Sequence, residues 1–102
     1  MTVSLSTHVL DAEAGRPRVG VPVRVERDGA VLERGVTDED GRLRFAHVLS
    51  PGVHRLVFDV DTPFYPEITV AFRVAAPGAG QPDHLHVPIL LSPFAFTTYR
   101  GS

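Results

Sequence analysis

The chain has 102 residues, a formal net charge of −2 and 43% hydrophobic residues, which fits one small globular domain over residues 1–102. It has no cysteine, and its ten basic residues are all arginines that form no basic cluster, so disulfides and thiol chemistry are excluded and nucleic-acid binding is unsupported. No apolar run reaches about 18 residues and no signal-peptide pattern opens the chain, so we expect no membrane span and a cytoplasmic location.

Eight short segments alternate apolar with polar residues and are bounded by glycine, proline or acidic turns, which is the pattern of strands. In chain order they are 4–10, 21–28, 31–36, 43–48, 53–60, 67–75, 84–91 and 94–99. The remaining segments are short connections, and the most loop-like of them is 76–83. No segment has a convincing helical period. The sequence therefore predicts an all-β fold, a Greek-key β-sandwich.

The histidines are the first candidates for chemistry. There are five of them: His8, His47, His54, His84 and His86. On a strand, His84 and His86 are two positions apart, so they share a face at a separation of about 7 Å. His8 lies in the first strand, where the alternation places it on the same face as Ser4 and Ser6.

Three interpretations of these histidines are open at this level. They can be ordinary surface or satisfied interior residues. The pair at 84 and 86 can join a distant third histidine in a zinc site, although no cysteine or carboxylate stands beside it at ligand spacing. They can also form a metal-free acid–base site, because imidazole exchanges protons near neutral pH.

Arg42 follows an acidic turn, Asp-Glu-Asp-Gly at 38–41. The turn superficially resembles part of a calcium loop, but an EF-hand would need acids where Val36 and His47 stand. Beside histidines, Arg42 can clamp an anion or stabilise an oxyanion. Neither a nucleophile elbow nor a glycine-rich phosphate loop is present, so activated water is the natural nucleophile for an enzyme of this composition.

Several motifs together resemble one known family. They are Leu-Ser-Thr-His-Val-Leu-Asp at 5–11, Asp-Gly-Arg at 40–42, His-Val-Pro at 86–88, Leu-Ser-Pro at 91–93 and the terminal Tyr-Arg-Gly-Ser at 99–102. Nearly the whole chain is similar to the hydroxyisourate hydrolases, the transthyretin-related proteins of purine catabolism. Transthyretins proper share that fold but lack the terminal tetrapeptide.

The resemblance implies a transthyretin sandwich of two four-stranded sheets and a homotetramer with active sites at the channel between dimers. It implies metal-free and cofactor-free hydrolysis of 5-hydroxyisourate, the urate oxidase product, to 2-oxo-4-hydroxy-4-carboxy-5-ureidoimidazoline. The catalytic residues of the family match His8, Arg42 and His86. Its substrate-binding end matches Tyr99, Arg100, Gly101 and Ser102.

The chain departs from the family at a few places. The family usually has tyrosine where this chain has Leu85, and different residues at Ala95 and Phe96. The segment 59–66 is short, so the short helix that the family carries there is expected to be deleted. Two alternatives to the hydrolase are a small-ligand-binding module on the same fold and a structural sandwich module of the carboxypeptidase-regulatory type.

Overall fold

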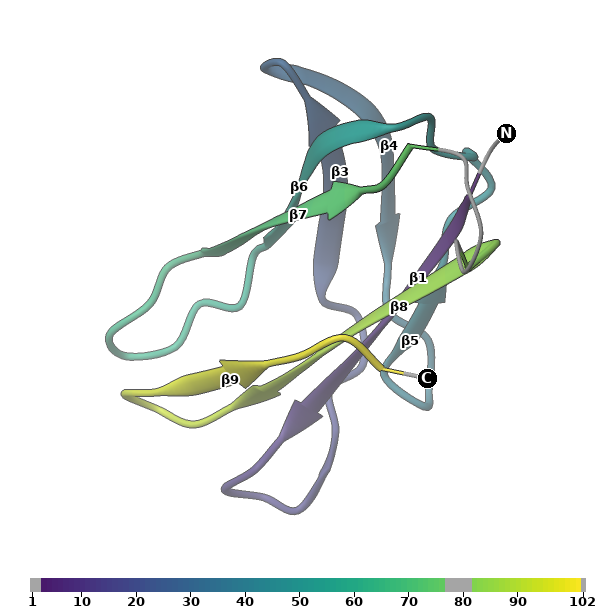
Figure 1. Cartoon of the computed structure of the whole chain (residues 1–102). Helices are drawn as coiled ribbons and strands as arrows, with labels where there is room; N and C mark the ends of the chain where they lie inside the picture. The colour runs from purple at the N-terminus through teal and green to yellow at the C-terminus, as the bar shows by residue number, and fades with distance from the viewer. Residues whose placement is uncertain (1–2, 77–81, 102) are drawn as a thin grey trace.

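The fold is an all-β sandwich of two sheets, as the alternation predicted (Figure 1). The computed structural model describes residues 3–76 and 82–101. The strands are β1 (Ser4–Asp11), β2 (Arg16–Pro17), β3 (Pro22–Arg27), β4 (Ala30–Val36), β5 (Arg42–Arg44), β6 (Gly52–Phe58), β7 (Ile68–Val74), β8 (His84–Leu91) and β9 (Phe96–Thr98). Most of the loop predicted over 76–83 lies outside the described residues, and so does Ser102.

The first sheet has the order β2-β1-β8-β9, with β5 also paired to β1. It therefore has five strands where four were expected. The reason is the length of β1, whose eight residues pair with β8 along one edge. Its other edge is shared by two short strands, β5 at residues 6–8 and β2 at residues 10–11. β1 and β8 run parallel, whereas the other pairings in this sheet are antiparallel.

The second sheet has four antiparallel strands in the order β4-β3-β6-β7. Alternate residues of the two sheets meet in one core. Members with 0% exposure include Leu5, Val9, Val25, Leu56, Phe58 and Ile89. Burial of such side chains supplies about 1.5–3 kcal/mol each. Since one face of β1 and β8 is committed to this core, their other face is left for polar residues.

Two predicted strands are only half as long in the structure as predicted. The strand expected over 43–48 ends at Arg44, because the carboxylate of Glu33 accepts hydrogen bonds from the amides of Ala46 (3.1 Å) and His47 (2.6 Å). Those amides are thereby withdrawn from strand pairing. The strand expected over 94–99 is reduced to Phe96–Thr98.

The connection between β6 and β7 contains no helix, as the sequence led us to expect. It turns instead at Thr62, whose backbone amide donates to the carbonyl of Tyr65 at 2.8 Å and whose hydroxyl accepts from the Tyr65 amide at 2.8 Å. Asp61 takes a positive φ of 47° just before this turn. A reversal this tight brings the chain straight back into β7.

Candidate active site

The polar face of the first sheet brings the three predicted catalytic residues together. β1 lies between β5 and β8, so His8 has Arg42 as its cross-strand partner on one side. On the other side Ser6 is the partner of His86. Adjacent strands lie about 4.8 Å apart and alternate residues about 7 Å apart. His8, Arg42 and His86 therefore converge from positions that are far apart in the chain.

A pocket of about 440 Å³ opens on this face. Its walls are formed by Ser6, Thr7, Asp38, Arg42, Leu43, Arg44, His84 and His86. His8 is not among these lining residues, but its neighbour Arg42 is. The charged lining residues are Arg42, Arg44 and Asp38, so positive charges outnumber negative ones in the pocket. A positively charged pocket can stabilise negative charge that develops on a polar substrate.

His8 is held by the acidic turn. Its Nε2 lies 2.8 Å from the carbonyl oxygen of Asp40. A carbonyl can only accept, so Nε2 carries the proton and the neutral ring has its lone pair on Nδ1. The turn is itself fixed by Asp38, whose Oδ1 accepts from the amides of Asp40 and Arg42, each at 2.9 Å.

Gly41 lets the turn sit against β1. Its φ is +71°, and a Cβ at this position would lie 2.5 Å from the carbonyl oxygen of Val9 and 2.8 Å from Cβ of Pro17. The Val9 amide also donates to the Gly41 carbonyl at 2.7 Å. Only glycine fits this conformation and this space, which explains the glycine before Arg42.

His86 has the environment of a base. Its Nδ1 lies 2.8 Å from Oγ of Ser6. Burial lowers the pKa of His86, and the positive charges of Arg42, His8 and His84 lower it further, while a hydrogen bond with the backbone of Ser6 opposes the shift. The imidazole is therefore neutral at physiological pH and able to accept a proton.

Arg42 projects an exposed guanidinium beside the pocket. Within residues 3–76 and 82–101, no carboxylate forms an ion pair with it. Both backbone polar groups of Arg42 are hydrogen-bonded to Asp38. The Arg42 amide donates to Oδ1 of Asp38 at 2.9 Å, and the Arg42 carbonyl accepts from the Asp38 amide at 2.8 Å. The cationic group is thus available to a ligand while its base is fixed.

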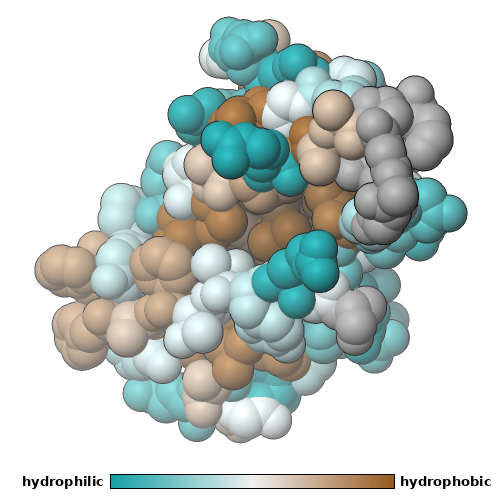
Figure 2. Space-filling model, viewed as in Figure 1, coloured by the Kyte–Doolittle hydropathy of each residue, from teal (hydrophilic) through white to brown (hydrophobic). Residues whose placement is uncertain are grey.

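The C-terminal segment divides between two surfaces. After β9 the chain comes back alongside β8 (Figure 1). There the amide of Gly101 donates to the carbonyl of His86 at 2.7 Å. Tyr99 and Arg100 instead line a separate groove of about 310 Å³ beside Phe72 and Leu85. Figure 2 shows hydrophobic surface between the two sheets. In this single chain, Tyr99 does not line the pocket that holds Arg42 and His86, and Ser102 lies outside the described residues.

The departures from the family lie away from this pocket. Leu85 is 9% exposed and belongs to the core, so its side chain points away from the polar face of His84 and His86. Phe96 packs edge-on against Tyr65 with ring centroids 5.3 Å apart. Neither residue lines the 440 Å³ pocket.

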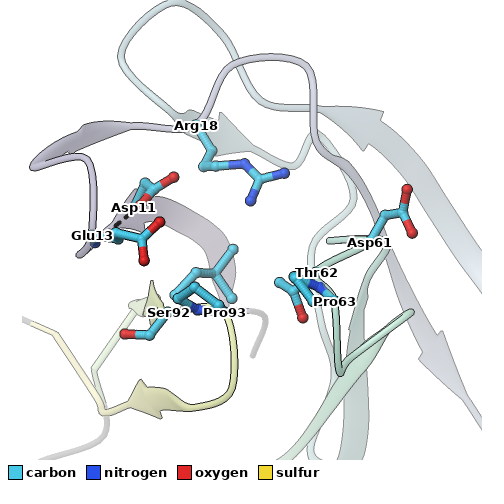
Figure 3. A pocket seen from close by; sticks show the side chains of 9 residues that line it. Asp11, Glu13, Arg18, Asp61, Thr62, Pro63, Ser92 and Pro93 are labelled. Atoms are coloured by element: carbon cyan, nitrogen blue, oxygen red, sulfur yellow. Dashed lines mark hydrogen bonds between the residues drawn. The ribbon is translucent and has the colours of Figure 1, made fainter.

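A second pocket, of about 190 Å³, lies at the far end of β1 (Figure 3). One of its acidic groups, Asp11, has a structural role. Oδ1 of Asp11 accepts from the amides of Glu13 (3.0 Å) and Ala14 (2.9 Å), which closes the turn after β1. Arg18 donates to the carbonyl of Val60 at 3.1 Å, which ties the segment after β2 to the segment after β6. The pocket therefore lies between connecting segments of the two sheets.

Two polar neighbours of His86, namely Ser6 and His84, are not among the residues that the sequence predicted as catalytic or substrate-binding, although His84 was weighed with His86 as part of a metal or acid–base pair. The sequence alternation places Ser6 on the same face as His8, and His84 on the same face as His86. It does not reveal that β1 and β8 are parallel neighbours, which is what joins these pairs. Within the described ranges, no group of three or more histidine or acidic side chains could hold a metal ion, and no helix could span a membrane.

These features define a small two-sheet β-sandwich with an imidazole- and guanidinium-lined pocket on one sheet, a protein equipped for acid–base chemistry on a polar substrate. The chain belongs to the HIUase/Transthyretin family, whose model matches residues 5–101.

The chain is similar over most of its length to named members of this family. The 5-hydroxyisourate hydrolase of Caulobacter vibrioides is 38% identical over 116 residues, which cover 96% of this chain and 97% of that protein. The enzyme of the same name from Mus musculus is 36% identical, with 96% and 94% covered. A solved structure of 5-hydroxyisourate hydrolase from Klebsiella pneumoniae superposes with a TM-score of 0.86 at 32% identity, covering 98% of this chain and 94% of that one.

The alignments with the two curated relatives, over 116 and 115 residues, are longer than this chain of 102. These relatives therefore carry residues that this chain lacks. The direct, helix-free connection between β6 and β7 is consistent with a deletion there.

Proposed function

We propose that this protein hydrolyses 5-hydroxyisourate, the product of urate oxidase, to 2-oxo-4-hydroxy-4-carboxy-5-ureidoimidazoline. The observation that carries the proposal is the convergence of His8, Arg42 and His86 on the polar face of one sheet. The relatives from Caulobacter vibrioides and Mus musculus, which are more than a third identical over nearly the whole chain, carry the name of this activity.

His86 acts as the general base. Its Nε2 takes a proton from a water molecule, and the oxygen of that water adds to a ring carbonyl of the substrate. The carbonyl oxygen becomes an oxyanion, which the guanidinium of Arg42 stabilises. When the intermediate collapses, the ring C–N bond breaks and the protonated imidazole returns its proton to the leaving nitrogen. One water is consumed, and the base is regenerated.

His8 and the C-terminal segment position the substrate. His8 is oriented by the Asp40 carbonyl and stands beside Arg42, where it can hydrogen-bond a flat polar ring. Gly101 passes directly over His86 and closes one side of the site. Tyr99, Arg100 and Ser102 complete substrate binding in a homotetramer, with sites at the channel between dimers. A cytoplasmic location and a single functional domain over 1–102 belong to the same proposal.

The test is the ultraviolet decay of freshly made 5-hydroxyisourate with the purified protein. We expect His8→Ala and His86→Ala to lower turnover by about 10²–10⁴-fold. Arg42→Ala should lower it by about 10²–10³-fold. The control is His47→Ala, since His47 is exposed and lies outside the pocket. An inactive wild type, or three variants with unchanged rates, would overturn the proposal.

The same assay separates the hydrolase from the alternative of a non-enzymatic binding module. A binding module would bind 5-hydroxyisourate or a stable analogue such as urate without speeding its decay. Its affinity would also depend on Arg42 while the decay rate stayed at the uncatalysed value.

A further inference from the structure

A row of four polar side chains runs along the outer face of β1 and β8. Oγ of Ser4 lies 2.6 Å from Nδ1 of His84, and Nε2 of His84 lies 2.8 Å from Oγ of Ser6. Oγ of Ser6 in turn lies 2.8 Å from Nδ1 of His86. The parallel register produces this row, because it pairs Ser4 with His84 and Ser6 with His86. Each serine therefore stands level with one histidine.

The direction of these hydrogen bonds follows from the outer end of the row. The hydroxyl of Ser4 donates to the carbonyl of Asp83 at 3.3 Å, and a carbonyl can only accept. With its one hydrogen used, the oxygen of Ser4 accepts from Nδ1–H of His84. A neutral imidazole has one N–H, so Nε2 of His84 accepts from the hydroxyl of Ser6.

This direction fixes the protonation of His86. The single hydrogen of Ser6 points to His84, so the oxygen of Ser6 accepts from Nδ1–H of His86. The neutral ring of His86 then has its lone pair on Nε2. If Ser6 donated to His86 instead, Nε2 would carry the hydrogen and could not take a proton from water.

We propose that Ser6 and His84 are positioning residues that hold His86 in the tautomer with an unprotonated Nε2. The proposal deepens the proposed hydrolase function and rests on it for its kinetic consequences. Neither residue takes a proton from the substrate. Their effect reaches the reaction through the hydrogen-bond direction and ring orientation of His86. The tautomer itself can be measured without any turnover.

The direct test is nitrogen-15 NMR of the histidine side chains in the wild-type protein at a pH where His86 is neutral. We expect the signals of protonated Nδ1 and unprotonated Nε2 for His86. In Ser6→Ala the oxygen acceptor is lost, and the two tautomers should mix. A wild-type His86 with its hydrogen on Nε2 would overturn the proposal.

The kinetic test uses the decay of 5-hydroxyisourate. Ser6→Ala and His84→Ala should each lower kcat by about tenfold or more with little change in KM, because ring orientation matters in the transition state. The double variant should be about as slow as the slower single variant, since both residues act along one row. Effects that multiply in the double variant would overturn the proposal.

Two controls separate positioning from structure. Ser6→Thr keeps the hydroxyl, so its kcat and the tautomer of its His86 should match the wild type. Such a rescue would show that the loss in Ser6→Ala comes from the missing hydroxyl and not from misfolding. Thr69→Ala alters an exposed residue of the other sheet and should leave both unchanged. A wild type with the expected tautomer but no hydrolysis would count against the proposed function alone. Active protein with the opposite tautomer would count against this inference alone.

Discussion

The backbone of Gly101 lies directly against the ring of His86. Its amide donates to the His86 carbonyl at 2.7 Å, and a Cβ built on Gly101 would come within 2.6 Å of Cδ2 of the imidazole. The C-terminal segment therefore covers the base, and the absence of a side chain at 101 permits the contact. This relationship ties the end of the chain to the proposed reaction centre.

Gly101→Ala should consequently disturb His86 more than it disturbs the fold. The added methyl group must displace either the terminal segment or the imidazole, and a misplacement of about 1 Å can cost up to about 10²-fold in rate. We expect a loss of turnover of about ten- to a hundredfold with an unchanged thermal midpoint. The matched control is Thr97→Ala, an exposed position on the same hairpin. Full activity in Gly101→Ala would contradict the contact.

The pH dependence of the reaction should follow His86. Burial and the positive charges of Arg42, His8 and His84 lower the pKa of His86 below the ordinary value of about 6.5. The base therefore stays neutral as the pH falls to 6.5, and kcat/KM should decline only at lower pH. Because Arg42 contributes to the shift, NMR titration of Arg42→Gln should show a higher pKa for His86 than the wild type.

The control for that titration is Arg73→Gln, on the second sheet. It should leave the pKa of His86 where it is in the wild type. If Arg42→Gln leaves the titration unmoved, Arg42 does not face His86 as described.

His54 should make the protein less stable in acid. It is 1% exposed and stacks on Phe72 with ring centroids 5.8 Å apart, and its Nε2 has no hydrogen-bond partner within the described residues. Burial lowers the pKa of His54, the hydrogen bond to the Gly52 carbonyl opposes the shift, and Arg27 adds to the lowering. The unfolded chain then binds more protons than the folded one as the pH falls below about 6.5, so stability declines.

Urea unfolding at pH 7.5 and pH 5.5 measures this effect. His54→Leu should lose less stability between the two pH values than the wild type does, while Thr69→Leu, at an exposed position of β7, should lose as much as the wild type. His86 also has a lowered pKa, so some acid dependence should persist in His54→Leu. An identical loss in His54→Leu and the wild type would contradict the assignment to His54.

Chelation should leave hydrolysis intact. The facing nitrogens of His84 and His86 are both directed at Oγ of Ser6, at 2.8 Å each, and are therefore engaged by a hydroxyl. Dialysis against a strong chelator should change the decay rate of 5-hydroxyisourate by less than the error of the assay. A loss of activity that zinc restores would instead favour the metal site that the spacing of His84 and His86 allowed.

Much of the fold could be predicted because alternation is local. Leu5, Val9 and Val25 are buried where the pattern placed them, and the sequence predicted the two-sheet sandwich. The early end of β5 could not be predicted, since it depends on the Glu33 carboxylate reaching the amides of Ala46 and His47 from another strand. Such a contact has no signature in the residues of the segment itself.

The sequence by itself determined which residue types the site could use. Without cysteine or a nucleophile elbow, and with His8, Arg42 and His86 in family motifs, it indicated acid–base chemistry with water. Only the tertiary structure shows which of the site residues are neighbours and which hydrogen bonds they form. The parallel pairing of β1 with β8 sets Ser6 between His84 and His86 and so gives His86 its hydrogen-bonded neighbour. These residues are 78 to 80 positions apart in the chain, so they meet only because β1 and β8 pair in this register. The pairing and its register depend on burial of the whole core.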